Sequence, residues 1–240
     1  MKVTTHTTGP VMMMIKNSCR GVIAAVIFTF FMAPYGFAQQ SDFRFWTSAG
    51  VGLEIFKDVS LLVQEEVRFK ENCTQMDRQM NDLGINVKIN KYFRTSLFYR
   101  IEADWKTADD YVWRHGLHAD LLFRYKAGRF QFGYRSRFQS ARIEFNKKDD
   151  RMLASMINRH KFKLDYNIKS LPLSPFAEGE LFYEVDRNRY DLTDYRAWIG
   201  LEYTPGKIHE FSIKYGFDRE RMDPVTAYIV ALNYTVNLGL

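Results

Sequence analysis

The sequence feature that most constrains this fold is the alternation of apolar and charged residues with a period of two. In the stretch TSLFYRIEADWK, residues 95–106, one row of alternate residues reads T-L-Y-I-A-W and the other S-F-R-E-D-K. Because successive side chains of a β-strand point to opposite faces, this stretch predicts a strand with one apolar and one charged face.

The same alternation recurs in eleven segments, and no segment of helical period and convincing length follows residue 39. The eleven segments are 42–56, 59–71, 78–90, 93–106, 112–126, 129–144, 157–169, 174–186, 194–204, 207–219 and 225–240. An all-β chain follows from this pattern. Bacterial barrels of outer membranes have even strand numbers. We therefore expect ten to twelve strands, with segment 42–56 either broken near Gly50 and Gly52 or lying partly inside a ten-stranded barrel.

The connections between these segments indicate which kind of β-protein this is. Tight turns at 57–58, 90–92, 126–128, 170–174 and 205–206 alternate with longer polar connections at 72–77, 107–111, 145–156, 187–193 and 220–224. Short turns at one end and longer loops at the other are typical of outer-membrane barrels, whose short turns lie in the periplasm.

Aromatic residues gather at the ends of the segments, where the interfacial girdle of a membrane barrel would lie. They are Tyr92, Phe93, Trp105, Tyr111, Trp113, Tyr125, Phe130, Tyr190, Tyr195 and Tyr203. The last segment, 225–240, resembles the assembly signal of outer-membrane barrels, although it ends in Leu240 rather than an aromatic residue. We expect it to engage the barrel-assembly machinery.

Together these patterns predict a transmembrane antiparallel up-and-down β-barrel of 10–12 strands, with its apolar row toward lipid and its charged row toward the interior. Closure into a barrel satisfies every backbone hydrogen bond, which a membrane requires. The expected surroundings are outer-membrane lipid and lipopolysaccharide. A secreted soluble barrel or sandwich, with its charged face in water, is the alternative.

The first 38 residues differ from the rest of the chain. Lys16 and Arg20 precede the apolar run GVIAAVIFTFFM at 21–32, and small residues Gly36 and Ala38 follow. This order predicts a cleavable secretory signal peptide over residues 1–38 and a barrel over 39–240. Cys73 is then the single cysteine of the mature chain, which excludes an internal disulfide.

The net charge argues against nucleic acid as a partner. The whole chain has a formal charge of +6, and three of its basic residues fall within the signal segment, where no acid lies. The remaining chain is near +3, and its charges form no basic run interleaved with stacking aromatics. We therefore expect no nucleic-acid binding.

Residues 46–151 resemble domain-of-unknown-function family 2490, a family of outer-membrane barrels of Bacteroidetes. The resemblance rests on W-T at 46–47, QEEVRF at 64–69, D-R at 77–78, NKYF at 90–93, R-H at 114–115 and YKAGRFQFGYRSRFQ at 125–139. It implies a barrel architecture and a cell outer-membrane location after export. It implies no activity and no catalytic residue.

Four arginines form the candidate ligand site: Arg78, Arg114, Arg159 and Arg196 each stand near the start of a strand that follows a longer loop, in the charged row. They predict a ring of guanidinium groups inside the outer mouth, which would favour a small anionic solute. The competing interpretation pairs them with carboxylates that fill the lumen. Thirteen inward bases against twelve inward acids, and bulky inward residues Phe56, Phe98, Phe182 and Trp198, favour this second interpretation.

Two chemical alternatives stay open. A lipid-modifying enzyme would need a histidine beside a serine on the lipid-facing wall, and His115, His160 and Ser155 lie near the expected outer rim, with no His-x-Ser pair on one strand face. The rim acids Asp109, Asp110, Asp149 and Asp150 could hold a cation weakly.

We expect no catalytic residue, no metal and no cofactor. The leading hypothesis is a non-enzymatic barrel with a narrow charge-lined lumen for binding or passage of a small polar or anionic solute. A structural or surface-interaction barrel with a plugged lumen and a lipid-modifying enzyme are the alternatives.

Overall fold

The computed structural model describes residues 41–107, 109–140, 143–145, 156–186, 189–221 and 225–239. The signal peptide expected over residues 1–38 lies outside them. The strands are β1 (Ser41–Phe56), β2 (Val59–Lys70), β3 (Gln75–Lys88), β4 (Phe93–Trp105), β5 (Tyr111–Ala127), β6 (Phe130–Ser140), β7 (Ile143–Glu144), β8 (Met156–Tyr166), β9 (Leu173–Asp186), β10 (Arg189–Tyr203), β11 (His209–Glu220) and β12 (Thr226–Gly239). In the described part of the chain, no helix has the length and apolar character needed to cross a membrane.

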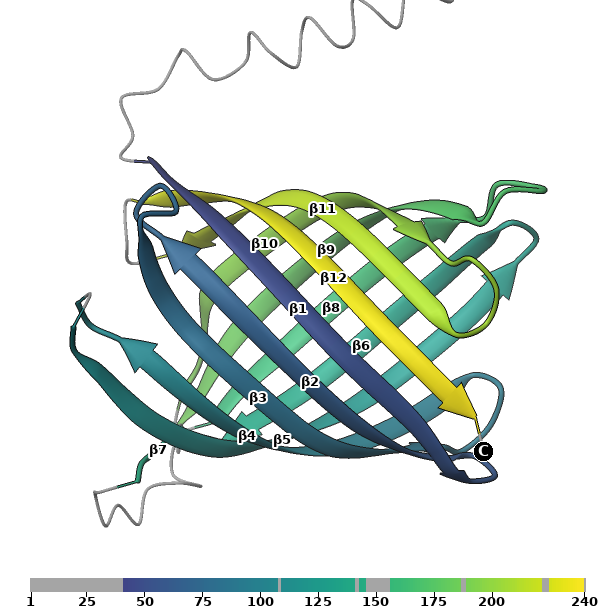
Figure 1. Ribbon diagram of the computed structural model, residues 1–240, viewed down its shortest axis with the longest axis horizontal. Coiled ribbons are helices and arrows are strands. Elements are labelled where there is room, and N and C mark those ends of the chain that lie inside the picture. The colour runs from purple at the N-terminus through teal and green to yellow at the C-terminus, as the bar shows by residue number, and fades with distance from the viewer. Residues whose placement is uncertain are drawn as a thin grey trace, which may run out of the picture. The chain divides into compact units, whose positions relative to one another are not determined.

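These strands close into one barrel (Figure 1). Its wall has eleven strand positions, because β6 and the short β7 share one. Each long strand pairs antiparallel with the next, and the two-residue β7 continues β6 along β5. The ring closes between β1 and β12, which run parallel from the Ser41 and Thr226 pair to the Glu54 and Gly239 pair. The expectation of an all-β barrel is confirmed, whereas the expectation of a wholly antiparallel barrel is wrong.

The eleven-segment reading of the sequence agrees with the strands, and its adjustment to ten or twelve was wrong. β1 runs without a break through Gly50 and Gly52, because both glycines pair with β12 on one side and with β2 on the other. When consecutive strands alternate in direction, an odd number of strands makes the first and last strands parallel where the barrel closes. As a result, β1 begins at the rim opposite to the one where β12 ends.

We name the two ends of the barrel from these strands. The N-terminal rim is the end where β1 begins, and it carries the connections 71–74, 106–110, 141–155, 187–188 and 221–225. The C-terminal rim is the end where β12 finishes, and it carries 57–58, 89–92, 128–129, 167–172 and 204–208. Only 141–155 is distinctly long, since β10 already begins at Arg189, within the loop expected at 187–193. The predicted loop asymmetry therefore reduces to one connection.

The barrel is inverted relative to a soluble protein, because its apolar residues lie outside and its charges inside. Leu97 on the outward row of β4 is 59% exposed, while Glu102 and Asp104 on the inward row are 0% and 5% exposed. The inward row also buries Arg100 and Arg137. The prediction that the charged row faces the interior is confirmed.

Three inward glycines each lie under an inward aromatic ring of the neighbouring strand. The paired residues are Gly84 with Phe98, Gly200 with Phe176, and Gly216 with Trp198. A Cβ added at any of these glycines would lie within 3 Å of the ring. The missing side chain lets each ring lie flat against the barrel wall.

The bulky inward residues predicted from the sequence mostly occupy the interior. Phe98, Phe182 and Trp198 are buried. Phe56 is 71% exposed, because the strand register shifts between Glu54 and Phe56 at the C-terminal rim. The prediction that Phe56 narrows the interior is wrong.

Candidate functional site: the lumen

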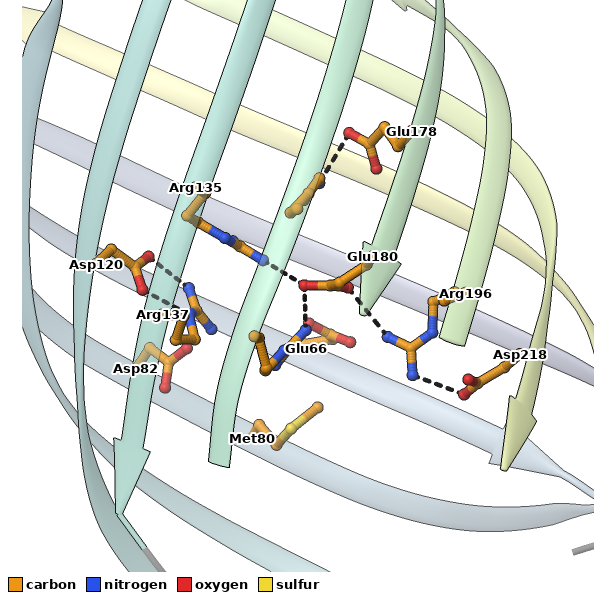
Figure 2. A network of polar contacts seen from close by, with 12 residues as sticks. Glu66, Met80, Asp82, Asp120, Arg135, Arg137, Glu178, Glu180, Arg196 and Asp218 are labelled. Carbon is orange, nitrogen blue, oxygen red and sulfur yellow. Dashed lines mark hydrogen bonds and ion pairs between the residues drawn. The ribbon is translucent and has the colours of Figure 1, made fainter. Parts of the chain in front are cut away.

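One carboxylate in the lumen gathers three arginines, and Figure 2 shows two of them, Arg135 and Arg196, on either side of Glu180. Glu180 of β9 has a side chain that is 5% exposed. Its Oε1 accepts hydrogen bonds from Nη2 of Arg135 at 2.9 Å and from Nη2 of Arg159 at 3.0 Å. Nη1 of Arg196 lies 3.7 Å from its Oε2. We call Glu180, Arg135, Arg159 and Arg196 the triarginine cluster.

The strand pairing explains why these side chains converge. Arg196 on β10 lies directly opposite Glu180, and Arg159 on β8 lies opposite Phe182, two residues along β9. Arg135 of β6 reaches across β8 to the same carboxylate. Arg196 also donates to Asp218 of β11 at 2.6 Å, so the cluster and this acid join five neighbouring strands.

Other arginines of the wall form two-bonded pairs with acids of adjacent strands. Arg100 donates to both carboxylate oxygens of Asp82 at 2.7 and 2.6 Å. Arg137 donates to both oxygens of Asp120 at 2.7 and 2.8 Å. Both are direct cross-strand partners. Such pairs hold planar guanidinium groups rigidly, and they fix the wall on one side of the lumen.

Two tryptophan rings near the β1–β12 closure of the barrel lie against the arginines of the lumen. Trp46 of β1 packs edge-on against Trp198 of β10, with ring centroids 5.6 Å apart. The guanidinium of Arg68 lies 3.8 Å from the Trp46 ring centroid, and that of Arg196 lies 4.8 Å from it. Cation–π contacts of this kind stabilise a basic group without neutralising its charge.

The cavity enclosed by these groups has a volume of about 360 Å³, within the usual range for a small-molecule site. Ten basic side chains and six carboxylates line it. Asp120 and Asp218 stand behind the lining, as partners of Arg137 and Arg196. Asp165 stands behind the lining as well, 2.7 Å from Lys163, so ten basic side chains face nine acids once these three are counted. The positive excess is therefore confined to the lining of the cavity, and the near-equality of charges expected from the sequence returns when the acids behind the lining are included.

The four arginines singled out from the sequence separate into two groups. Arg159 and Arg196 belong to the triarginine cluster. Arg78 faces Asp104 in the β3–β4 register, and Nη1 of Arg114 donates to the same Asp104 at 2.6 Å. The four therefore do not form a single ring. Alternation places Arg135 and Glu180 on the inward row as well, but the contact of Arg135 across β8 has no signal in the sequence that would assign them to the site.

The residues proposed for other chemistries are less organised. His115 packs against Phe145 and Tyr99, and no hydrogen bond joins it to a serine among the described residues. Ser155, Asp149 and Asp150 lie outside the described residues. Within the described ranges, no group of three or more His, Cys, Asp or Glu residues is placed to hold a metal ion.

A family model described as "Protein of unknown function (DUF2490)" matches residues 43–224. The chain belongs to this family. The match covers the DUF2490 barrel from β1 through β11, which is more of the chain than the resemblance at 46–151 had indicated. The lumen cluster of this DUF2490 protein therefore lies wholly within the family's matched region.

No curated protein matches the chain. One solved chain is similar to it over 70% of this chain and 68% of that chain, with 14% identity and a TM-score of 0.38. That structure was reported under the words "Unveiling the Mechanism Behind the in-meso Crystallization of Membrane Proteins".

Proposed function

We propose that this protein is an outer-membrane β-barrel whose positively charged lumen binds or passes a small anionic solute. The observation that carries this proposal is the excess of basic over acidic side chains in the lining of the cavity, ten against six. Rings of arginine and lysine in a narrow pore favour anions, and guanidinium groups bind carboxylate and phosphate with two parallel hydrogen bonds.

The outer wall supports the membrane location. Aromatic residues cluster at both rims, with Trp105, Tyr111 and Trp113 in contact at the N-terminal rim. At the C-terminal rim, Phe211 stacks on Tyr234 with ring centroids 4.6 Å apart. Between these clusters the outward residues are mainly large and apolar. An apolar band between two aromatic girdles is the surface of a transmembrane barrel.

Orientation in the membrane can be tested at Cys73. This residue lies in the 71–74 connection at the N-terminal rim, and it is the single cysteine after residue 38. Partial burial raises the pKa of its thiol, and the nearby Asp42 carboxylate raises it further, so labelling should be done at about pH 8.5. With the N-terminal rim outside, a membrane-impermeant maleimide should label intact cells.

The matched control places the thiol at the other rim. Asp58→Cys in a Cys73→Ser background lies in the 57–58 turn of the C-terminal rim. It should be labelled only after the cells are broken. Labelling of the two positions in the reverse order would contradict the orientation.

The anion proposal is tested by the reversal potential of single channels in planar bilayers under a salt gradient. Wild type should favour anions. Arg159→Gln with Arg196→Gln removes two lumen charges, each worth about 1 kcal/mol to a nearby ion even at the dielectric constant of water. Anion preference should then fall about tenfold or more.

The control for this pair is Lys57→Gln with Lys88→Gln, which removes the same charge at the C-terminal rim. Lys88 is exposed and pairs there with Asp58. This variant should keep the wild-type reversal potential. Equal preference in wild type and in the Arg159 and Arg196 variant would reject the lumen as the selective element.

A plugged barrel is the second candidate, and ion pairs between non-adjacent strands favour it. Arg135 to Glu180 joins β6 to β9, Lys163 to Glu202 joins β8 to β10, and Lys214 to Glu178 joins β11 to β9. If these bridges stay closed, inserted protein will be silent in the bilayer, and its role will lie at the rims or on the wall.

A further inference from the structure

A cluster of polar side chains lies on the outward row of β6, β8 and β10, where the membrane proposal expects apolar residues. Nδ1 of His160 lies 2.7 Å from the hydroxyl of Tyr134, and its Nε2 lies 3.0 Å from the hydroxyl of Tyr190. Asn158 donates to the Tyr190 hydroxyl at 3.4 Å and accepts from Ser136 at 3.3 Å. Polar groups facing lipid are costly and usually serve a function.

An apolar groove adjoins this cluster on the same wall. It has a volume of about 430 Å³ and is lined on its outward side by Phe123, Phe132, Tyr134, Phe162, Leu164, Ala177 and Gly179. Tyr134 belongs to both features, since its ring also packs against Phe162 at 5.1 Å. The small residues Ala177 and Gly179 make the hollow, and a Cβ added at Gly179 would meet no atom within 4 Å.

The polar cluster and the apolar groove lie one after the other along β8, as the ester groups and acyl chains of a lipid do. β8 starts at the N-terminal rim, and its outward residues read Asn158, His160, Phe162 and Leu164 in order. The polar pair thus lies on the side of β8 toward the N-terminal rim, and the apolar pair lies on the side toward the C-terminal rim. The cluster presents an imidazole, an amide and hydroxyl groups and no arginine or lysine, so it suits the ester and hydroxyl groups of a lipid better than the lipid's phosphate.

We propose that this wall holds one acylated lipid, with an acyl chain in the groove and its ester groups at the Tyr134, His160 and Tyr190 cluster. This inference rests on the proposed membrane location. It does not depend on anion passage through the lumen, which involves the inward residues only. Ser136 lies directly opposite His160 but donates to Asn158, so the geometry supports binding and no hydrolytic step.

The test is native mass spectrometry of detergent-purified protein with added dipalmitoyl phosphatidylethanolamine. Wild type should retain one lipid. Gly179→Leu fills the groove and should lower lipid affinity about tenfold, whereas Val63→Leu, which adds bulk to the outward row of β2, should leave it unchanged. Tyr190→Phe removes the hydroxyl that is hydrogen-bonded to both His160 and Asn158. This variant should bind the lipid more weakly although its groove stays open.

Equal lipid retention by Gly179→Leu, Val63→Leu and wild type would overturn this inference. Failure of the membrane proposal would look different, because protein outside the membrane would show neither membrane fractionation nor a mobility shift between unheated and boiled samples. A protein that inserts and conducts anions, but loses no lipid in Gly179→Leu or Tyr190→Phe, rejects the lipid site alone.

Discussion

Replacing Glu180 with glutamine is expected to destabilise the barrel and to make its stability depend on added anions. The substitution keeps the size of the side chain but leaves Arg135 and Arg159 without the carboxylate that accepts their hydrogen bonds. Removing one partner of a buried ion pair costs about 3 kcal/mol, because the remaining charges are uncompensated. Urea unfolding of the detergent-solubilised protein, followed by gel mobility, would measure this loss.

Inorganic phosphate should then restore part of the lost stability of Glu180→Gln by occupying the vacated position between the arginines. A ligand that binds only the folded state stabilises it by about 2.7 kcal/mol at a hundredfold excess over its Kd. Wild type should respond less, since its own carboxylate fills the position.

The control for Glu180 is Glu210→Gln, which removes a charge from the same cavity lining at an exposed carboxylate. It should show neither a large loss of stability nor a large phosphate response. If phosphate stabilises wild type, Glu180→Gln and Glu210→Gln equally, the triarginine cluster is not an anion site.

Gly216→Ala is expected to be the most damaging single-methyl change in the lumen wall. A Cβ at this position would lie 2.1 Å from the carbonyl oxygen of Ala197 and 2.7 Å from the Trp198 ring. The carbonyl belongs to the backbone of β10 and cannot move aside as a side chain can. Overpacking of this kind costs typically 1–3 kcal/mol, and we expect about 3 kcal/mol here.

The measurement is the urea midpoint together with tryptophan emission, since displacement of Trp198 would change its surroundings. Gly179→Ala is the control, because a Cβ there meets no atom within 4 Å. It should keep the wild-type midpoint. A Gly216→Ala protein as stable as Gly179→Ala would contradict the close packing of β10 on β11.

Period-two alternation was sufficient to find all eleven long strands of the barrel, because the side-chain period of a strand is a local property of the backbone. The strand number went wrong only where a general rule on even-numbered barrels replaced the count. Whether β1 pairs with β12 in parallel depends on contacts between residues far apart in the sequence, such as Trp46 with Ala231. No local pattern carries that information.

The sequence predicts that the side chains of the candidate site point into the lumen, but it does not predict which of them contact one another. Alternation correctly turned Arg159, Arg196 and Glu180 inward. Their convergence depends on cross-strand register and on reach across β8 by Arg135, neither of which alternation specifies. The loop lengths misled for a related reason, since β9 and β10 pair through polar residues that read as a loop around Arg189 and Asp191.

The closure between β1 and β12 is the claim on which the lumen, its charge and the placement of the two rims all depend. Val51 and Val236 are register partners on the outward row of this parallel pair. In a Cys73→Ser background, Val51→Cys with Val236→Cys should be joined within one chain by a short thiol cross-linker, because adjacent strands lie about 4.8 Å apart. Val63→Cys with Val236→Cys, which places the first thiol on the outward row of β2 at the register partner of Val51, should not be joined, because β1 lies between them. Failure to cross-link Val51→Cys with Val236→Cys in folded, membrane-inserted protein would contradict the eleven-stranded barrel and the lumen derived from it.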